Sequence, residues 1–131
     1  MNPGSLIELP LRYKPWRTRH LRLVLRDLGG PARQPEGEHR AHLEGAIDWL
    51  RHAQDMRDGR SDAGGVAAGW SFEDGWLPGY PETTGYIVET FLAAAPVLQR
   101  PELVDRARRM IDWELSLQSD DGAFPGHFGE P

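Results

Sequence analysis

Apolar residues recur at helical spacing in several stretches of the chain. Between residues 18 and 28, Leu21, Val24, Leu25 and Leu28 stand at i, i+3, i+4 and i+7, which predicts a helix with one apolar stripe. Gly29-Gly30-Pro31 ends this helix, and a polar linker over residues 32–38 follows. The next helix is expected over residues 39–56, where five apolar residues share one side: Leu43, Ala46, Ile47, Leu50 and Ala53.

The C-terminal half predicts two more helices with a tight connection. Thr83 or Thr84 can cap a helix that runs to about Leu98, and Pro101 suits the first turn of the next one. Their expected inward residues are Ile87, Val88, Phe91, Leu92, Ala95, Leu103, Val104, Ala107, Met110, Ile111 and Leu117. Residues 57–82, rich in glycine and aromatic side chains, are predicted to form a long loop. The pattern therefore predicts an all-α fold.

Two segments of the chain resemble each other. Ala46-Ile47-Asp48-Trp49 recurs as Met110-Ile111-Asp112-Trp113, and a glutamine, Gln54 or Gln118, follows each tryptophan at the fifth position, before a glycine-rich turn. Copies separated by the length of two helices and their connections are typical of stacked helical pairs. We expect each tryptophan to pack on a neighbouring helix, each glutamine to bond free backbone groups, and the glycines to turn with positive φ. Both copies should then lie in equivalent surroundings.

This arrangement resembles the repeats of the terpenoid cyclase and protein prenyltransferase superfamily, whose members fold as α-α toroids. The residues that carry the resemblance are Trp49, Gln54, Gly64, Gly65, Trp113, Gln118, Asp121, Gly122 and Phe124. It implies helical hairpin repeats that form part of an α-α toroid over residues 39–131, after a basic N-terminal segment, residues 1–38. Because the second copy stops where another helix should begin, we expect the chain to be a fragment of a longer protein.

The catalytic motifs of that superfamily are incomplete in this sequence. In Gln118-Ser119-Asp120-Asp121, a glutamine replaces the first acid of the class II cyclase motif. The string that starts at Asp120 lacks the last acid of the class I metal motif, and the absence of cysteine excludes the zinc site of protein prenyltransferases. His39 and His42 have helical spacing but no evident third ligand. We therefore expect neither a metal nor a cofactor.

Residues 70–86 hold the densest chemistry, with five aromatic rings and three carboxylates. Aromatic faces can stabilise a carbocation or stack on a sugar, and carboxylates can act as acid or base. The predicted catalytic residues are Glu82, Asp74 and His127, the last from the equivalent turn of the second copy, and the predicted substrate-binding residues are Trp70, Trp76, Tyr80 and Tyr86. In the alternative interpretation Glu82 only caps its helix, the aromatic rings pack at the surface, and His127 is merely exposed.

The charge distribution is uneven. The 131 residues carry a net charge of -5, which argues against a general nucleic-acid binder, yet the basic residues Arg12, Lys14, Arg17, Arg19, Arg22 and Arg26 follow one another without an acid. The segment 12–28 either contacts an anionic membrane surface or packs its leucines on the protein. Without a signal peptide or a spanning apolar run, we expect a cytoplasmic protein, at most peripheral to a membrane.

Three functions remain open from the sequence. The first is a module of a terpenoid cyclase- or prenyltransferase-like enzyme that acts on an isoprenoid or isoprenoid-linked substrate. The second is a carbohydrate-active toroid, whether hydrolase, lyase or epimerase, and the third is a non-catalytic repeat scaffold that binds a partner or itself. An aliphatic and aromatic cavity favours the first, a polar cleft with two carboxylates the second, and an exposed apolar helix face near the C-terminus the third.

Overall fold

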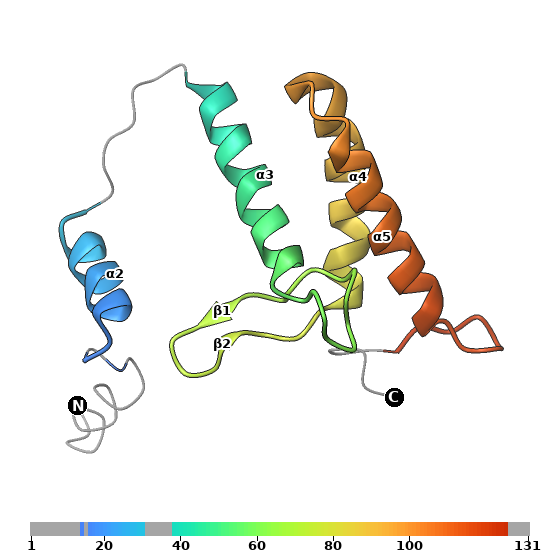
Figure 1. Cartoon of the computed structure of the whole chain (residues 1–131), viewed down its shortest axis with the longest axis horizontal. Helices are drawn as coiled ribbons and strands as arrows, with labels where there is room; N and C mark the ends of the chain where they lie inside the picture. Colours follow the sequence, from blue (N-terminus) through green and yellow to red (C-terminus); the bar gives the residue numbers. More distant parts are fainter. Residues whose placement is uncertain (1–13, 15, 31–37, 126–131) are drawn as a thin grey trace. The chain divides into compact units, whose positions relative to one another are not determined.

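The computed structural model describes residues 14, 16–30 and 38–125, and this part of the chain is mostly helical. The elements follow in the order α2 (Thr18–Leu28), α3 (His39–Asp55), β1 (Trp70–Ser71), β2 (Gly75–Trp76), α4 (Pro81–Leu98) and α5 (Glu102–Leu117) (Figure 1). The predicted all-α class is confirmed at the level of a mainly helical chain. The segment predicted as a loop contains a short β-hairpin, β1–β2.

The described chain divides into two compact units. The first consists of the described residues up to Glu38 together with Trp70–Gly75, the tip of the hairpin. The second consists of His39–Gly69 and the described residues from Trp76 onward. The tip of the hairpin thus groups with the N-terminal segment.

The start of α4 has the proline expected of a first helical turn, but it lacks the predicted cap by Thr84. α4 begins at Pro81, and proline suits the first helical turn because it has no N–H to satisfy. Thr84 does not cap this helix. Its side chain is buried, and its hydroxyl accepts a hydrogen bond of 3.0 Å from the backbone N–H of Val66, which fixes the preceding loop against α4.

The core of the second unit lies among α3, α4 and α5. α4 and α5 form a hairpin of neighbouring antiparallel helices, and α3 also contacts α4 (Figure 1). The tight connection depends on Gln99 in the left-handed conformation, φ 56°, after which the Arg100 N–H returns to the Ala95 carbonyl at 2.9 Å. The buried apolar residues include Ile47, Ala53, Val66, Phe91, Ala94, Ala95, Leu98, Leu103, Ala107 and Met110.

The two tryptophans of the repeat have unlike surroundings, so the expectation of equivalence is wrong. Trp113 is only 6% exposed, whereas Trp49 is 53% exposed. The reason is a glycine seat formed by Gly64, Gly65 and Gly79, which the Trp113 side chain approaches so closely that a Cβ on Gly65 would lie 2.7 Å from its ring. No comparable glycine loop precedes Trp49 in the part of the chain that the structure describes.

The two glutamines are more alike. The buried Gln54 amide donates to the Gly64 carbonyl at 3.0 Å, and the Gln118 amide donates to the Gly122 carbonyl at the same distance. Each thus bonds a glycine carbonyl in the turn after its helix, and both glycines have positive φ as expected. Gln54 also donates to the Arg106 carbonyl of α5, which ties the first copy to the second.

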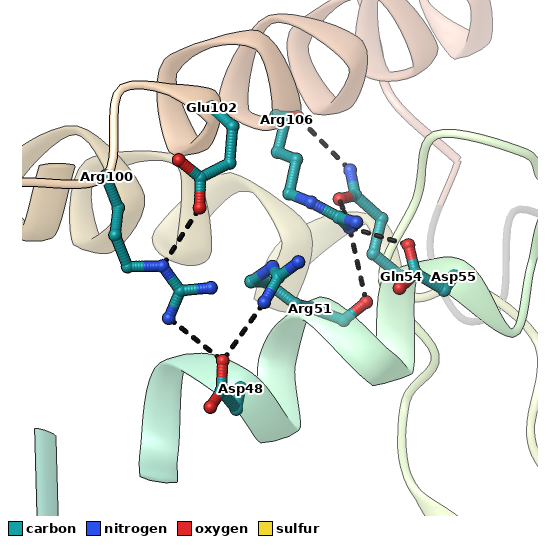
Figure 2. Close-up of polar contacts among 7 residues, drawn as sticks. All are labelled: Asp48, Arg51, Gln54, Asp55, Arg100, Glu102 and Arg106. Carbon is teal, nitrogen blue, oxygen red and sulfur yellow. Dashed lines mark hydrogen bonds and ion pairs between the residues drawn. The ribbon is translucent and has the colours of Figure 1, made fainter. Parts of the chain in front are cut away.

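A polar network joins α3 to α5 (Figure 2). Arg106 contacts Asp55 at 2.7 Å and donates to the Gln54 side-chain oxygen at 3.0 Å. Arg100, between α4 and α5, bonds both Asp48 and Glu102 at 2.9 Å (Figure 2). The hydrogen bond from Arg100 lowers the pKa of the Asp48 carboxyl, but Asp48 is largely exposed, so this contact stabilises the fold only weakly.

A buried ion pair holds the hairpin base. The Arg57 guanidinium, 7% exposed, donates to both carboxylate oxygens of Asp62 at 2.7 and 2.8 Å and to the Leu77 carbonyl at 3.0 Å. Asp62 also accepts the Gly79 N–H. Burial raises the pKa of Asp62, but the hydrogen bonds from Arg57 and Gly79 outweigh it, so the net pKa lies below the usual value of 3.8.

Candidate functional site

In the first unit, an aromatic cluster joins α2 to the tip of the hairpin. His20, the buried residue of α2, meets the rings of Trp70 and Phe72 edge-on, at centroid distances of 5.5 and 5.2 Å. Trp70 and Phe72 lie 4.9 Å apart, also in a T-shaped arrangement. These edge-to-face contacts fix how α2 is rotated about its axis relative to the tip.

An apolar groove of about 590 Å³ lies beside this cluster. Its lining consists of Leu23, Val24, Leu28, Trp70, Phe72 and Asp27. The volume falls within the range of small-molecule sites, and the mixture of aliphatic and aromatic walls with few polar groups is typical of them. Of the predicted substrate-binding residues, Trp70 is the one that lines this groove.

A cation lies near the groove. The Arg19 guanidinium lies 5.7 Å from the centre of the Trp70 ring, within the range of a cation–π contact. Asp27 is the one carboxylate among the lining residues. A ligand with an apolar body and an anionic end would therefore meet apolar walls inside the groove and a positive charge beside Trp70.

Trp76 belongs to a different cluster, in the second unit. Its ring lies 5.0 Å from that of Trp49 with an angle of 40° between the planes, and His52 meets it edge-on at 5.3 Å. Trp49 and His52 come from neighbouring turns of α3. The repeat pattern predicts only a packing role for Trp49, whereas its ring is 53% exposed beside Trp76.

Tyr80, Glu82 and Tyr86 stand at the start of α4. The Tyr80 hydroxyl donates to Glu82 at 3.3 Å, and this hydrogen bond raises the pKa of Tyr80. Glu82 lies in the first turn of α4. Tyr86 is 71% exposed. The structure thus brings Glu82 and Tyr80 together, in the second unit, whereas Trp70 belongs to the first.

The two other predicted catalytic residues differ in placement. Asp74 lies in the turn of the hairpin, where its carboxylate accepts a hydrogen bond from the Ser71 hydroxyl at 3.4 Å and its own N–H donates to that hydroxyl at 2.9 Å. It therefore has a local role in shaping the turn. His127 lies outside the described residues. Among residues 14, 16–30 and 38–125, no three His, Cys, Asp or Glu side chains gather as a metal site would require.

A second, more polar hollow of about 380 Å³ lies beside Trp113. Asp58, Arg109 and Asp112 line it together with Ser61, Ala63, Gly64, Trp113 and Ser116. Arg109 forms an ion pair of 3.5 Å with Asp58. The walls of this hollow therefore carry two carboxylates and one guanidinium.

Comparison of the chain with known protein families, curated proteins and solved structures found no match. Within the described residues, none of the helices has both the length and the apolar character needed to cross a bilayer.

Sequence reasoning missed the groove because its walls come from distant segments. His20 and Leu23 lie far along the chain from Phe72, and helical periodicity says nothing of which segment covers a helix. The available signal was the position of His20, which stands off the apolar stripe of its helix. A histidine there is an ordinary surface residue unless an aromatic segment covers it.

Proposed function

We propose that this protein is a module of an α-α toroid enzyme and that it binds an isoprenoid or isoprenoid-linked molecule in the groove between α2 and the hairpin tip. The groove carries this proposal. Its walls are aliphatic and aromatic, with a single carboxylate, Asp27, which suits a hydrocarbon chain better than a polyhydroxylated ligand. The reaction is left unassigned, since the catalytic motifs of the terpenoid cyclase superfamily are incomplete in the sequence.

The toroid part of the proposal depends on the helical pairs. The α4–α5 hairpin, the two glutamine–glycine turns and the seat of Trp113 on the preceding loop are the contacts that a stacked repeat requires. The exposure of Trp49 weighs against a strict repeat. The proposal therefore takes its support from the glutamines and glycines rather than from the tryptophans.

Calorimetric titration with farnesyl phosphate, kept in its monomeric range, tests the proposal. We expect saturable binding by the full chain, and loss of that binding when Leu23→Trp fills the groove with a larger side chain. Trp49→Ala, which alters an exposed ring of the second unit, is the matched control and should bind as the unaltered chain does. Binding that survives Leu23→Trp, or no binding by the unaltered chain, would contradict the proposal.

A carbohydrate-active function is the second candidate. The hollow beside Trp113 supports it because Asp58 and Asp112 are both among its lining residues, and two carboxylates are the usual requirement of glycoside chemistry. The same titration with a soluble oligosaccharide separates the two candidates. Binding that Asp112→Asn abolishes, and that Leu23→Trp leaves intact, would favour this second function.

The scaffold alternative also has a specific support. Val104, Ile111 and Leu115 are exposed at i, i+7 and i+11 along α5, so one side of that helix presents apolar residues to solvent. We rank it below the isoprenoid proposal because the groove of the first unit has the volume and the apolar walls of a small-molecule site.

A further inference from the structure

The rotation of α2 is fixed by its contact with the hairpin tip. His20 is buried between Trp70 and Phe72, and Val24, one turn later, lines the groove next to the same two rings. The side of α2 that carries His20 and Val24 is therefore covered within its own unit. This rotation also determines which side chains of α2 face solvent.

Three leucines lie on an outward side of α2. Leu21, Leu25 and Leu28, at i, i+4 and i+7, are 42%, 58% and 77% exposed. We call them the outer leucines. Trp16, just before the helix, is 63% exposed as well. Burying such apolar surface is favourable, so a helix that leaves it in water is suited to meeting an apolar phase.

Three arginines form a row next to the outer leucines. Arg19, Arg22 and Arg26, at i, i+3 and i+7, share one side of α2, and Arg22 and Arg26 directly follow Leu21 and Leu25 in sequence. Leucines on one side and arginines beside them are the pattern of helices that lie in a membrane interface, where long basic side chains reach the anionic headgroups.

We propose that α2 docks on an anionic lipid bilayer, with the outer leucines in the boundary between headgroups and acyl chains and the arginine row against the headgroups. Charge complementarity identifies this partner. The chain as a whole carries a net charge of -5 and is repelled by an anionic surface, so the basic helix is the part that such a surface attracts. This surface shares Leu28 with the isoprenoid groove, and Arg19 lies beside that groove, whereas Leu21, Leu25, Arg22 and Arg26 do not line it. Leu25 and Arg22 therefore test the lipid proposal separately from the groove.

Vesicle co-sedimentation of the full chain tests the proposal. Vesicles of phosphatidylcholine with about a third phosphatidylserine should bind the chain, pure phosphatidylcholine vesicles should bind it far more weakly, and added salt should release it. This comparison needs no variant. Absence of binding to the anionic vesicles, or equal binding to both kinds, overturns the proposal.

Matched variants on α2 and α5 show whether α2 is the part of the chain that binds the vesicles. Leu25→Gln should weaken binding about tenfold, since it removes an apolar side chain from the interface. Leu115→Gln on α5 is the control, because Leu115 is 59% exposed and Leu25 is 58% exposed. Arg22→Gln should weaken binding about fivefold, and Arg108→Gln on α5 should leave it unchanged. Equal losses in the α2 and α5 variants would overturn the proposal.

Two further measurements distinguish lipid binding by α2 from ligand binding in the groove and from packing of the outer leucines on protein. Leu25→Gln should retain the farnesyl phosphate affinity of the unaltered chain, so failure of vesicle binding and failure of ligand binding are distinguishable. A fall in melting temperature with Leu25→Gln, together with no vesicle binding by the unaltered chain, would show that the outer leucines pack on protein, and the lipid proposal would be wrong.

Discussion

Trp113 shows how three small residues create a site for one large one. Gly64, Gly65 and Gly79 come from the loop after α3 and from the end of the hairpin, and all three approach the Trp113 side chain, Gly64 at its Cβ and the other two at its ring. Gly64 also needs glycine for its backbone, since its φ is +103° and a Cβ there would lie 2.7 Å from the Arg109 carbonyl. The burial of Trp113 therefore depends on the absence of side chains opposite it.

Gly65→Ala is predicted to destabilise the fold by about 2 kcal/mol, because the added methyl group would overlap the Trp113 ring. Thermal unfolding followed by circular dichroism measures the effect. Gly45→Ala is the matched control, since no atom lies within 4 Å of its added Cβ on α3, and alanine should there stabilise the helix by about 0.5–1 kcal/mol. Equal effects of the two substitutions would contradict the role of the seat.

Asp62→Asn is predicted to cost about 3 kcal/mol at neutral pH, because it leaves the Arg57 guanidinium buried without its anion. The folded pKa of Asp62 is lowered, so its stabilising contribution is present above the unfolded pKa and is lost as the pH falls through the folded value. The difference in melting temperature between the two proteins should therefore shrink below about pH 4. Asp48→Asn, at an exposed ion pair, should cost at most about 1 kcal/mol.

At the scale of elements, the contact between α2 and the hairpin tip decides what the N-terminal helix can do. α2 has one buried residue, His20, and all four of its leucines remain exposed. A helix of this length is marginal by itself, so it depends on the aromatic cluster for its order. The groove and the outer leucines both follow from this one attachment.

His20→Ala is predicted to loosen that attachment. Loss of two edge-to-face contacts should speed amide exchange in Thr18–Leu28 and in Trp70–Gly75 by about tenfold or more, whereas α5 should exchange as before. His52→Ala removes one edge-to-face contact with Trp76 in the second unit and serves as the control. Unchanged exchange in α2 would show that other contacts hold the helix.

The sequence predicts the elements well where the signal is local. The spacing of Leu21, Val24, Leu25 and Leu28 predicts α2 with the observed ends, and Pro101 marks the start of α5 within one residue. The short strands of the hairpin carry no such signal, because two residues each are too few for an alternating pattern. Their pairing depends on a turn that Asp74 and Ser71 stabilise.

At the scale of the whole molecule, the candidate site is harder to predict than the fold. The aromatic and acidic content of segment 70–86 predicts a site there, yet Trp70 and Trp76 belong to different units. The partners that give these residues their surroundings, His20 for Trp70 and Trp49 for Trp76, are distant in sequence. Composition finds the segment, whereas long-range packing decides which of its residues act together.

The shared hairpin also governs how this protein can be shortened for experiments. A recombinant version starting at His39 keeps all three helices of the second unit but strips Trp70 and Phe72 of the histidine that covers them. Bare aromatic rings on a strand pair promote aggregation, so poor solubility of such a version would not mean that the repeats cannot fold. Trimming at the apparent linker is thus the wrong choice for crystallisation, and the N-terminal helix should be retained.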